Sequence, residues 1–229
     1  MISHWPAALV ALATAACGLP RDADGTLDRV RGGTMRVGVV DNPPWVVSAP
    51  DGVGGVEGAF VTALARELGA RPEWVRRPES ELLEALRERE LDLVIGGLTS
   101  DLPWKHEVAF TKPYYTDTIV VGAPAGATPP DELDGHSVAV EAGSPAVAAV
   151  RKEGATPVPV ADLTRERGLI AAPSWRLSAL GREPSGITLH EVPHAIATPP
   201  GENAWLVHIE RRLRARRAEV PRLLRSAAP

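Results

Sequence analysis

Three apolar stretches decide the fold: MRVGVV at 35–40, GAFVTALARELG at 58–69 and LDLVIGG at 91–97. The first is typical of a β-strand and ends at the turn sequence DNPP at 41–44. The second repeats apolar residues at helical spacing, which predicts an amphipathic helix that ends at Gly69. The third is a continuous apolar run, as expected for a strand inside a parallel sheet.

Two further segments fill the intervals between these stretches. PEWV at 72–75 predicts a short strand, and the residues from Pro78 to Arg87 predict a second helix. The region 35–97 therefore alternates β-α-β-α-β, which predicts a parallel α/β sheet with helices on its faces. Because such sheets bind ligands at the carboxyl ends of their strands, we expect a site near Asp41–Trp45 and Gly97–Thr99.

A second α/β unit follows in the chain. DTIVVGA at 117–123 predicts a further strand, and the strand SVAVEA at 137–142 opens this second unit, with a helix after Gly143-Ser144-Pro145. The later segments are strand-like or, at the C-terminus, helical, and they lie at 155–160, 168–172, 187–192, 194–198 and 203–225.

The N-terminus carries the only cysteine, Cys17, so no disulfide can form within the chain of 229 residues. An apolar run at 5–16 has the length of a secretory signal, and Cys17-Gly18 follows small residues. This arrangement resembles a bacterial lipoprotein signal. We expect residues 1–17 to be a signal peptide with Cys17 acylated and residues 18–33 to be a tether. The alternative is a buried N-terminal helix with a free thiol.

Charge and motifs exclude several functions. The net charge of −4 argues against a nucleic-acid-binding surface. His190 and His194 flank a glutamate as in zinc proteases, but Pro193 and the flanking residues rule out the helix that such a site requires. GVGGVEG at 52–58 lacks the third glycine of a dinucleotide-binding loop. We therefore expect no metal and no cofactor.

The remaining candidates are pieces of a small-molecule pocket. Trp45 follows Pro43-Pro44 at one strand end, and Gly97–Thr99 lies at another. Gly143-Ser144 precedes a helix, whose free N–H groups attract anions. Tyr114-Tyr115 supplies aromatic side chains before the next strand. Aromatic walls with a few polar groups are typical of ligand pockets.

Four segments together, in this order, resemble solute-binding protein family 3, the periplasmic amino-acid-binding type: TLDRVRGGTMRVGVVDNPPW, GVEGAFVTALARELGARPEWV, LLEALRERELDLVIGGLTSDLPWKHEVAFTKPYY and LDGHSVAVEAGSPA. That family also includes the N-terminal domain of a membrane-bound lytic transglycosylase. The resemblance implies an α/β, two-lobed Venus-flytrap fold with parallel-rich sheets and a two-strand hinge. Lobe 1 would be 34–122 plus 193–229, and lobe 2 would be 123–192. Lobe 2 is expected to be short, because RERGLIAAP leaves little room for a full helix.

The resemblance also implies the ligand contacts. Trp45 stands where an aromatic residue packs on the ligand, Gly97 and Thr99 where its polar head is bound, and Ser144 where a carboxylate is held. The full expected set is Asp41, Trp45, Glu57, Gly97, Thr99, Trp104, Tyr115, Gly143, Ser144 and Trp175.

Two usual clamps for an amino acid are missing. The family arginine that binds the α-carboxylate corresponds to Trp104, and the neighbouring Lys105 is not equivalent to an arginine fork. The family aspartate that binds the α-ammonium corresponds to Pro173-Ser174. We therefore expect the ligand to differ from an ordinary amino acid. Trp45, Trp104 and Trp175 would instead line a more apolar or cation-stacking pocket.

The expected function is solute binding without catalysis. A monomer held by lipid to a membrane of the periplasm or cell envelope would deliver a small organic solute to an inner-membrane ABC permease. One alternative is a ligand-sensing accessory lipoprotein. Another is a dehydratase-like enzyme on the same fold, for which Glu57, Asp101, Glu107 and Glu141 would supply carboxylates.

Overall fold

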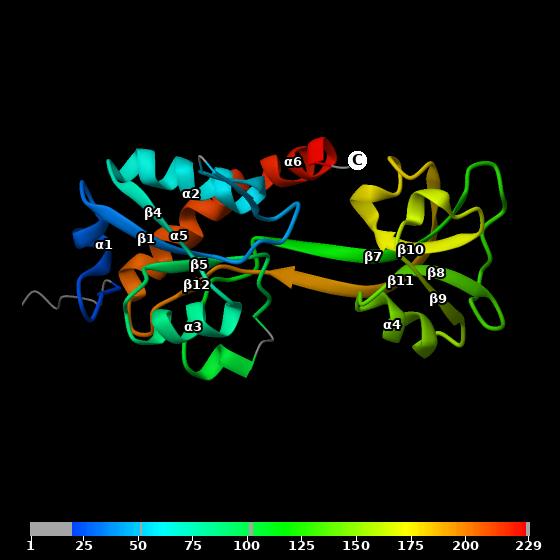
Figure 1. Cartoon of the computed structure of the whole chain (residues 1–229), viewed down its shortest axis with the longest axis horizontal. Coiled ribbons are helices and arrows are strands. Elements are labelled where there is room, and N and C mark those ends of the chain that lie inside the picture. Colours follow the sequence, from blue (N-terminus) through cyan, green and yellow to red (C-terminus); the bar gives the residue numbers. More distant parts are fainter. Residues whose placement is uncertain (1–19, 51, 101–102, 228–229) are drawn as a thin grey trace, which may run out of the picture.

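The computed structural model describes residues 20–50, 52–100 and 103–227. The chain forms two lobes, each built on a five-stranded sheet, and two long strands run from one lobe to the other (Figure 1). Cys17 lies outside the described residues. Among the helices of the described part, none is both long and apolar enough to span a bilayer.

The sheet of lobe 1 has the strand order β4-β1-β5-β12-β6. The first three strands are parallel, and β12 pairs antiparallel with both β5 and β6. The bounds are β1 Thr34–Val39, β4 Arg71–Arg76, β5 Leu93–Ile95, β6 Ala109–Phe110 and β12 Ala197–Thr198. This arrangement confirms the parallel α/β unit predicted from the alternation of strands and helices.

Helices cover both faces of this sheet. Alternate residues of a strand point to opposite faces, so Leu93 and Ile95 pack with one set of helices while Val94 packs with another. The first set is α2 (Gly55–Leu68), α5 (Asn203–Arg216) and α6 (Val220–Ala227), and the second is α3 (Glu79–Arg87). A short hairpin of β2 (Val47–Ala49) and β3 (Gly52–Gly54) precedes α2.

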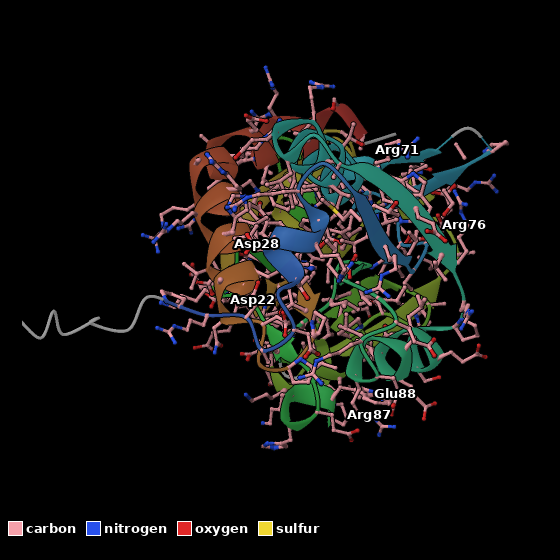
Figure 2. The ribbon with its side chains drawn as sticks, turned by 90° about the vertical axis from the view of Figure 1, so that its left-hand side faces the viewer. Asp22, Asp28, Arg71, Arg76, Arg87 and Glu88 are labelled. Carbon is pink, nitrogen blue, oxygen red and sulfur yellow. The ribbon has the colours of Figure 1, made fainter. Side chains whose placement is uncertain are left out.

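The segment expected to be a tether packs on lobe 1 over much of its length. Helix α1 (Thr26–Val30) buries Thr26 and Val30. The buried carboxylate of Glu202 accepts hydrogen bonds from the backbone N–H of Asp24 and Thr26. Asp22, beside α1 in Figure 2, accepts the N–H groups of Leu27 and Trp205 and so joins α1 to α5. Residues 22–33 therefore belong to the folded lobe, and the expectation of a tether over them was wrong.

Lobe 2 has the strand order β11-β7-β10-β8-β9. The strands β8 (Ser137–Glu141), β9 (Thr156–Val160) and β10 (Leu169–Pro173) are parallel. One helix, α4 (Ala146–Lys152), packs against them. Between β9 and β10 the structure has only the 3-10 turn η2 (Leu163–Arg165), which makes this lobe small, as its sequence predicts.

The hinge consists of β7 (Tyr115–Pro124) and β11 (Arg182–His194). They pair antiparallel and run side by side between the lobes (Figure 1). Tyr115 pairs with His194, and Asp117 pairs with Val192. Strand β11 is longer than the predicted strand at 187–192, because it continues through register irregularities on either side of Thr188. The C-terminal segment is also broken by the 3-10 turn η4 (Arg217–Glu219), after which α6 reaches a second 3-10 turn of lobe 2, η3 (Ser174–Arg176).

Candidate functional site

The loop after β1 brings Trp45 to the carboxyl end of the lobe 1 sheet. Asn42 pairs with Val46 through two backbone hydrogen bonds of 3.0 Å, and its side-chain amide donates to the carbonyl of Gly96 at 2.8 Å. The loop is thereby fixed to the end of β5. As a result Trp45 is held with only 5% of its surface exposed.

Trp45 is the centre of an aromatic cluster at the lobe 1 end of the hinge. Its ring lies on that of His194, with centroids 3.7 Å apart and planes tilted by 32°. The rings of Tyr114 and Tyr115 lie 6.3 and 5.8 Å away. The Nδ1–H of His194 donates to the carbonyl of Gly97 at 2.9 Å. Because burial dominates, the pKa of His194 falls from 6.5 to about 4, so its imidazole is neutral at physiological pH.

Glu57 lies beneath this cluster, in the first turn of α2, and is 1% exposed. Its Oε2 accepts the N–H groups of Gly96 at 2.7 Å and Gly97 at 2.9 Å, while its Oε1 accepts the hydroxyl of Tyr114 at 2.6 Å. Burial raises the pKa of Glu57, and the three hydrogen bonds oppose that rise. With both oxygens used inside the lobe, Glu57 is a structural support for the site.

Replacing Gly97 with alanine is expected to lower the free energy of unfolding by about 2 kcal/mol. Gly97 has φ +65°, and an added Cβ would lie 2.7 Å from Cδ1 of Trp45 and 2.8 Å from Nδ2 of Asn42. Gly143→Ala is the matched control, since Gly143 also has positive φ, +79°, but has nothing within 4 Å of its Cβ position. We expect about 1 kcal/mol there, from backbone strain alone. Urea denaturation measures both, and equal losses would contradict the contact with Trp45.

A cleft of about 420 Å³ lies between the lobes and is the candidate binding site. Lobe 1 and α6 contribute Pro43, Pro44, Trp45, Val47 and Ala227, the hinge contributes Asp117, and lobe 2 contributes Glu141, Pro173, Trp175 and Arg176. Trp175 also packs against the core of lobe 1, so the two lobes are in contact beside the cleft.

Three charged side chains line the cleft. Arg176 and Glu141 form an ion pair at 3.0 Å. Asp117 is 5% exposed, and its carboxylate accepts the N–H of Thr118 at 2.8 Å and the indole Nε1–H of Trp175 at 3.3 Å. Burial raises the pKa of Asp117, and these two hydrogen bonds only partly offset the effect. Within the described residues, no ion pair involves Asp117.

The structure brings some of the expected site residues together. Trp45 and Trp175 line the cleft, and Tyr115 lies half-buried beside Trp45. The carbonyl of Gly97 accepts the hydrogen bond that fixes the His194 ring against Trp45. The backbone of Thr99 forms an isolated antiparallel β-bridge with that of His194.

Other expected residues lie elsewhere. Trp104, in η1 (Pro103–His106), packs against the core beneath α3 and is absent from the lining of the cleft, so the expectation of a pocket lined by three tryptophans was wrong. Asp41 is exposed and accepts the N–H of Ser48 at 2.7 Å. Gly143 and Ser144 form the turn before α4, and neither lines the cleft, although the hydroxyl of Ser144 is buried with no partner in the described structure.

The carboxylates considered for acid–base chemistry are not gathered. Glu107 pairs with Arg87 on the surface, where Figure 2 places Arg87 beside Glu88, whereas Glu57 is enclosed in lobe 1. Asp101 lies outside the described residues. His190 and His194 both lie on β11, an extended strand, as the sequence predicts for them.

Sequence reasoning missed Asp117 and Arg176. A signal for Asp117 existed, because aspartate is depleted inside β-strands and this one begins the apolar run DTIVVGA. Arg176 follows directly after Trp175, and nothing in its neighbourhood distinguished it from the many surface arginines of the chain.

Two sheet-based lobes, a hinge of two strands and a cleft lined from both sides define a two-lobed solute-binding protein. The chain belongs to family 3 of the bacterial extracellular solute-binding proteins, whose profile matches residues 35–219.

Individual relatives agree with this assignment. The chain is 30% identical to the L-arginine-binding protein of Pseudomonas aeruginosa over 117 residues, 49% of this chain and 45% of that protein. It is 30% identical to membrane-bound lytic murein transglycosylase F of Vibrio cholerae over 95 residues, 40% of this chain and 18% of the enzyme. The chain thus spans less than half the length of these curated relatives. The solved structure of an ancestral cationic amino acid solute binding protein matches 89% of this chain over its own full length, with a TM-score of 0.71. Because the two sequences are only 20% identical, this similarity supports the fold alone.

Proposed function

We propose that this protein binds a small organic solute in the cleft between its lobes and delivers it, unaltered, to an ABC permease in the inner membrane. Cys17, acylated after signal cleavage, would hold it at the surface of a membrane in the cell envelope. The observation that carries the proposal is the cleft itself, which has side chains from both lobes and from the hinge strand β7.

The physical argument is one of hinge closure. Two strands, β7 and β11, join the lobes, and a solute that touches side chains of both lobes favours the conformation in which those side chains approach. Trp45 and Trp175 come from opposite lobes and offer the aromatic surface for such a contact. The closed form then presents a surface that the open form lacks, which is what a permease would recognise.

The test is to screen a broad metabolite panel against the purified chain by thermal shift, then to follow each hit by small-angle X-ray scattering and by mass spectrometry of the ligand. We expect a hit to lower the radius of gyration and to be recovered unchanged. A chemically altered ligand would favour the dehydratase-like alternative. Binding and closure without uptake by cells that contain the permease would favour the sensing alternative.

A further inference from the structure

The cleft contains a carboxylate that has no cationic partner in the described structure. Asp117 is almost fully buried and receives one backbone N–H and one long bond from an indole. Neither donor carries a charge, and removing an anion from water without a counter-charge costs free energy. A cation placed in the cleft would offset that cost.

The guanidinium in the cleft lining is already occupied. Arg176 is bound to Glu141 at 3.0 Å, and its side chain is only 18% exposed. Trp104, which the sequence placed near a ligand carboxylate, packs beneath α3 instead. Among the lining residues, no free cation remains to receive a carboxylate on the ligand.

The aromatic residues of the cleft complete the same chemistry. Trp45 and Trp175 both line it, and indole faces attract ammonium and guanidinium groups. The bond from the indole Nε1–H of Trp175 to Asp117 ties one of these rings to the carboxylate. A cation could therefore contact the carboxylate and an aromatic surface together.

We propose that the cleft binds an organic cation without a carboxylate, an alkyl amine or an alkyl guanidine, with Asp117 as its anionic partner and Trp175 and Trp45 beside its alkyl chain. This inference rests on the proposed function, because it names the ligand class of the same cleft. It distinguishes this chain from a binder of free amino acids, whose α-carboxylate would meet Asp117 and Glu141 with no unpaired guanidinium to receive it.

The experiment compares 4-guanidinobutylamine with arginine, two probes that differ only by the α-carboxylate, and adds 1,4-diaminobutane. Isothermal titration calorimetry of the purified chain is expected to give at least about tenfold tighter binding of 4-guanidinobutylamine than of arginine. Asp117→Asn should weaken that binding by about 30-fold, because the variant keeps the shape and loses the charge. Trp175→Phe, which keeps a ring and loses the N–H, should weaken it by about threefold.

Glu191→Gln is the matched control. Glu191 is exposed on the neighbouring hinge strand, where it pairs with Thr118, so it lies on the opposite face of the hinge from Asp117. The Glu191→Gln substitution removes one negative charge from the hinge, and the affinity for 4-guanidinobutylamine should stay within about twofold of that of the parent. If Asp117→Asn and Glu191→Gln weaken binding to a similar extent, Asp117 acts only through the overall negative charge of the hinge, and the inference is overturned.

Two further results would overturn it. One is arginine binding as tightly as 4-guanidinobutylamine, and the other is no binding of either amine at about 1 mM. If the amines fail while a neutral or anionic solute from the panel closes the lobes, the inference is wrong and the proposed function stands. If no solute of any charge closes the lobes, both fail.

Discussion

Replacing Glu57 with alanine is expected to lower the free energy of unfolding by about 4 kcal/mol, because three donors, two of them in buried hydrogen bonds, lose their acceptor at once. These donors are the N–H groups of Gly96 and Gly97 and the hydroxyl of Tyr114. The cavity left by the side chain adds to the loss. Urea denaturation, followed by tryptophan fluorescence, measures the change. Because the two N–H groups lie at the turn that holds Trp45, the fluorescence of the folded state should change as well.

Two variants separate the parts of this network. Glu57→Gln keeps one oxygen for the two backbone N–H groups and offers its amide to the Tyr114 oxygen, so we expect a loss of only about 1 kcal/mol. Glu67→Ala is the control on the same helix. Glu67 is partly exposed and paired with Arg212, and it should cost less than about 1 kcal/mol. A loss after Glu57→Ala no larger than that of Glu67→Ala would mean that the network contributes little to stability.

The elements of lobe 1 were predictable where the signal is local. The spacing of Phe60, Leu64 and Leu68 depends only on the side chains of one helix, and α2 ends at Leu68 before the left-handed Gly69, as expected. Its start was placed too late, at Gly58 instead of Gly55. The structure gives the reason: the N–H groups of Val56 and Glu57 donate to the carbonyls of Pro44 and Trp45. The helix is capped by the loop at Pro44 and Trp45, twelve residues before the N–H groups that it accepts, and no pattern within the helix reveals this.

The site was predictable only in part, because its contacts join distant positions. Trp45 could be placed from its strand end, whereas the bond between Trp175 and Asp117 joins residues 58 positions apart. Trp104 was expected at the cleft from its place in the family pattern. An indole without the charge of arginine gains more by packing on an apolar cluster, and Trp104 lies against the one that includes Leu82 and Leu83 of α3. The same argument applies to residues 22–33, whose docking depends on Glu202, far along the chain.

Lowering the pH from about 6.5 to about 4 is expected to cost about 3 kcal/mol of stability through His194 alone. Burial lowers the pKa of His194 to about 4, whereas the unfolded chain titrates near 6.5. Between these pH values the imidazole of His194 is protonated in the unfolded state and neutral in the folded state. The contribution of His194 is therefore complete above pH 6.5 and is lost as the pH falls toward 4.

The measurement is the pH dependence of the urea-unfolding free energy of the parent and of His194→Phe, which keeps a ring against Trp45 and cannot titrate. The variant loses the bond to Gly97 at every pH, and this loss does not itself depend on pH. The parent alone pays for the protonation of His194, so the unfolding free energy of the parent minus that of the variant should fall by about 3 kcal/mol as the pH falls from 6.5 to 4. Other shifted groups cancel in this difference: Glu57 and Asp117, whose pKa values are raised, and His208, whose pKa is lowered. His106→Gln, on the exposed turn η1, controls for the loss of an imidazole elsewhere in lobe 1. If the unfolding free energies of the parent and of His194→Phe change with pH in parallel, protonation of His194 does not destabilise the folded state.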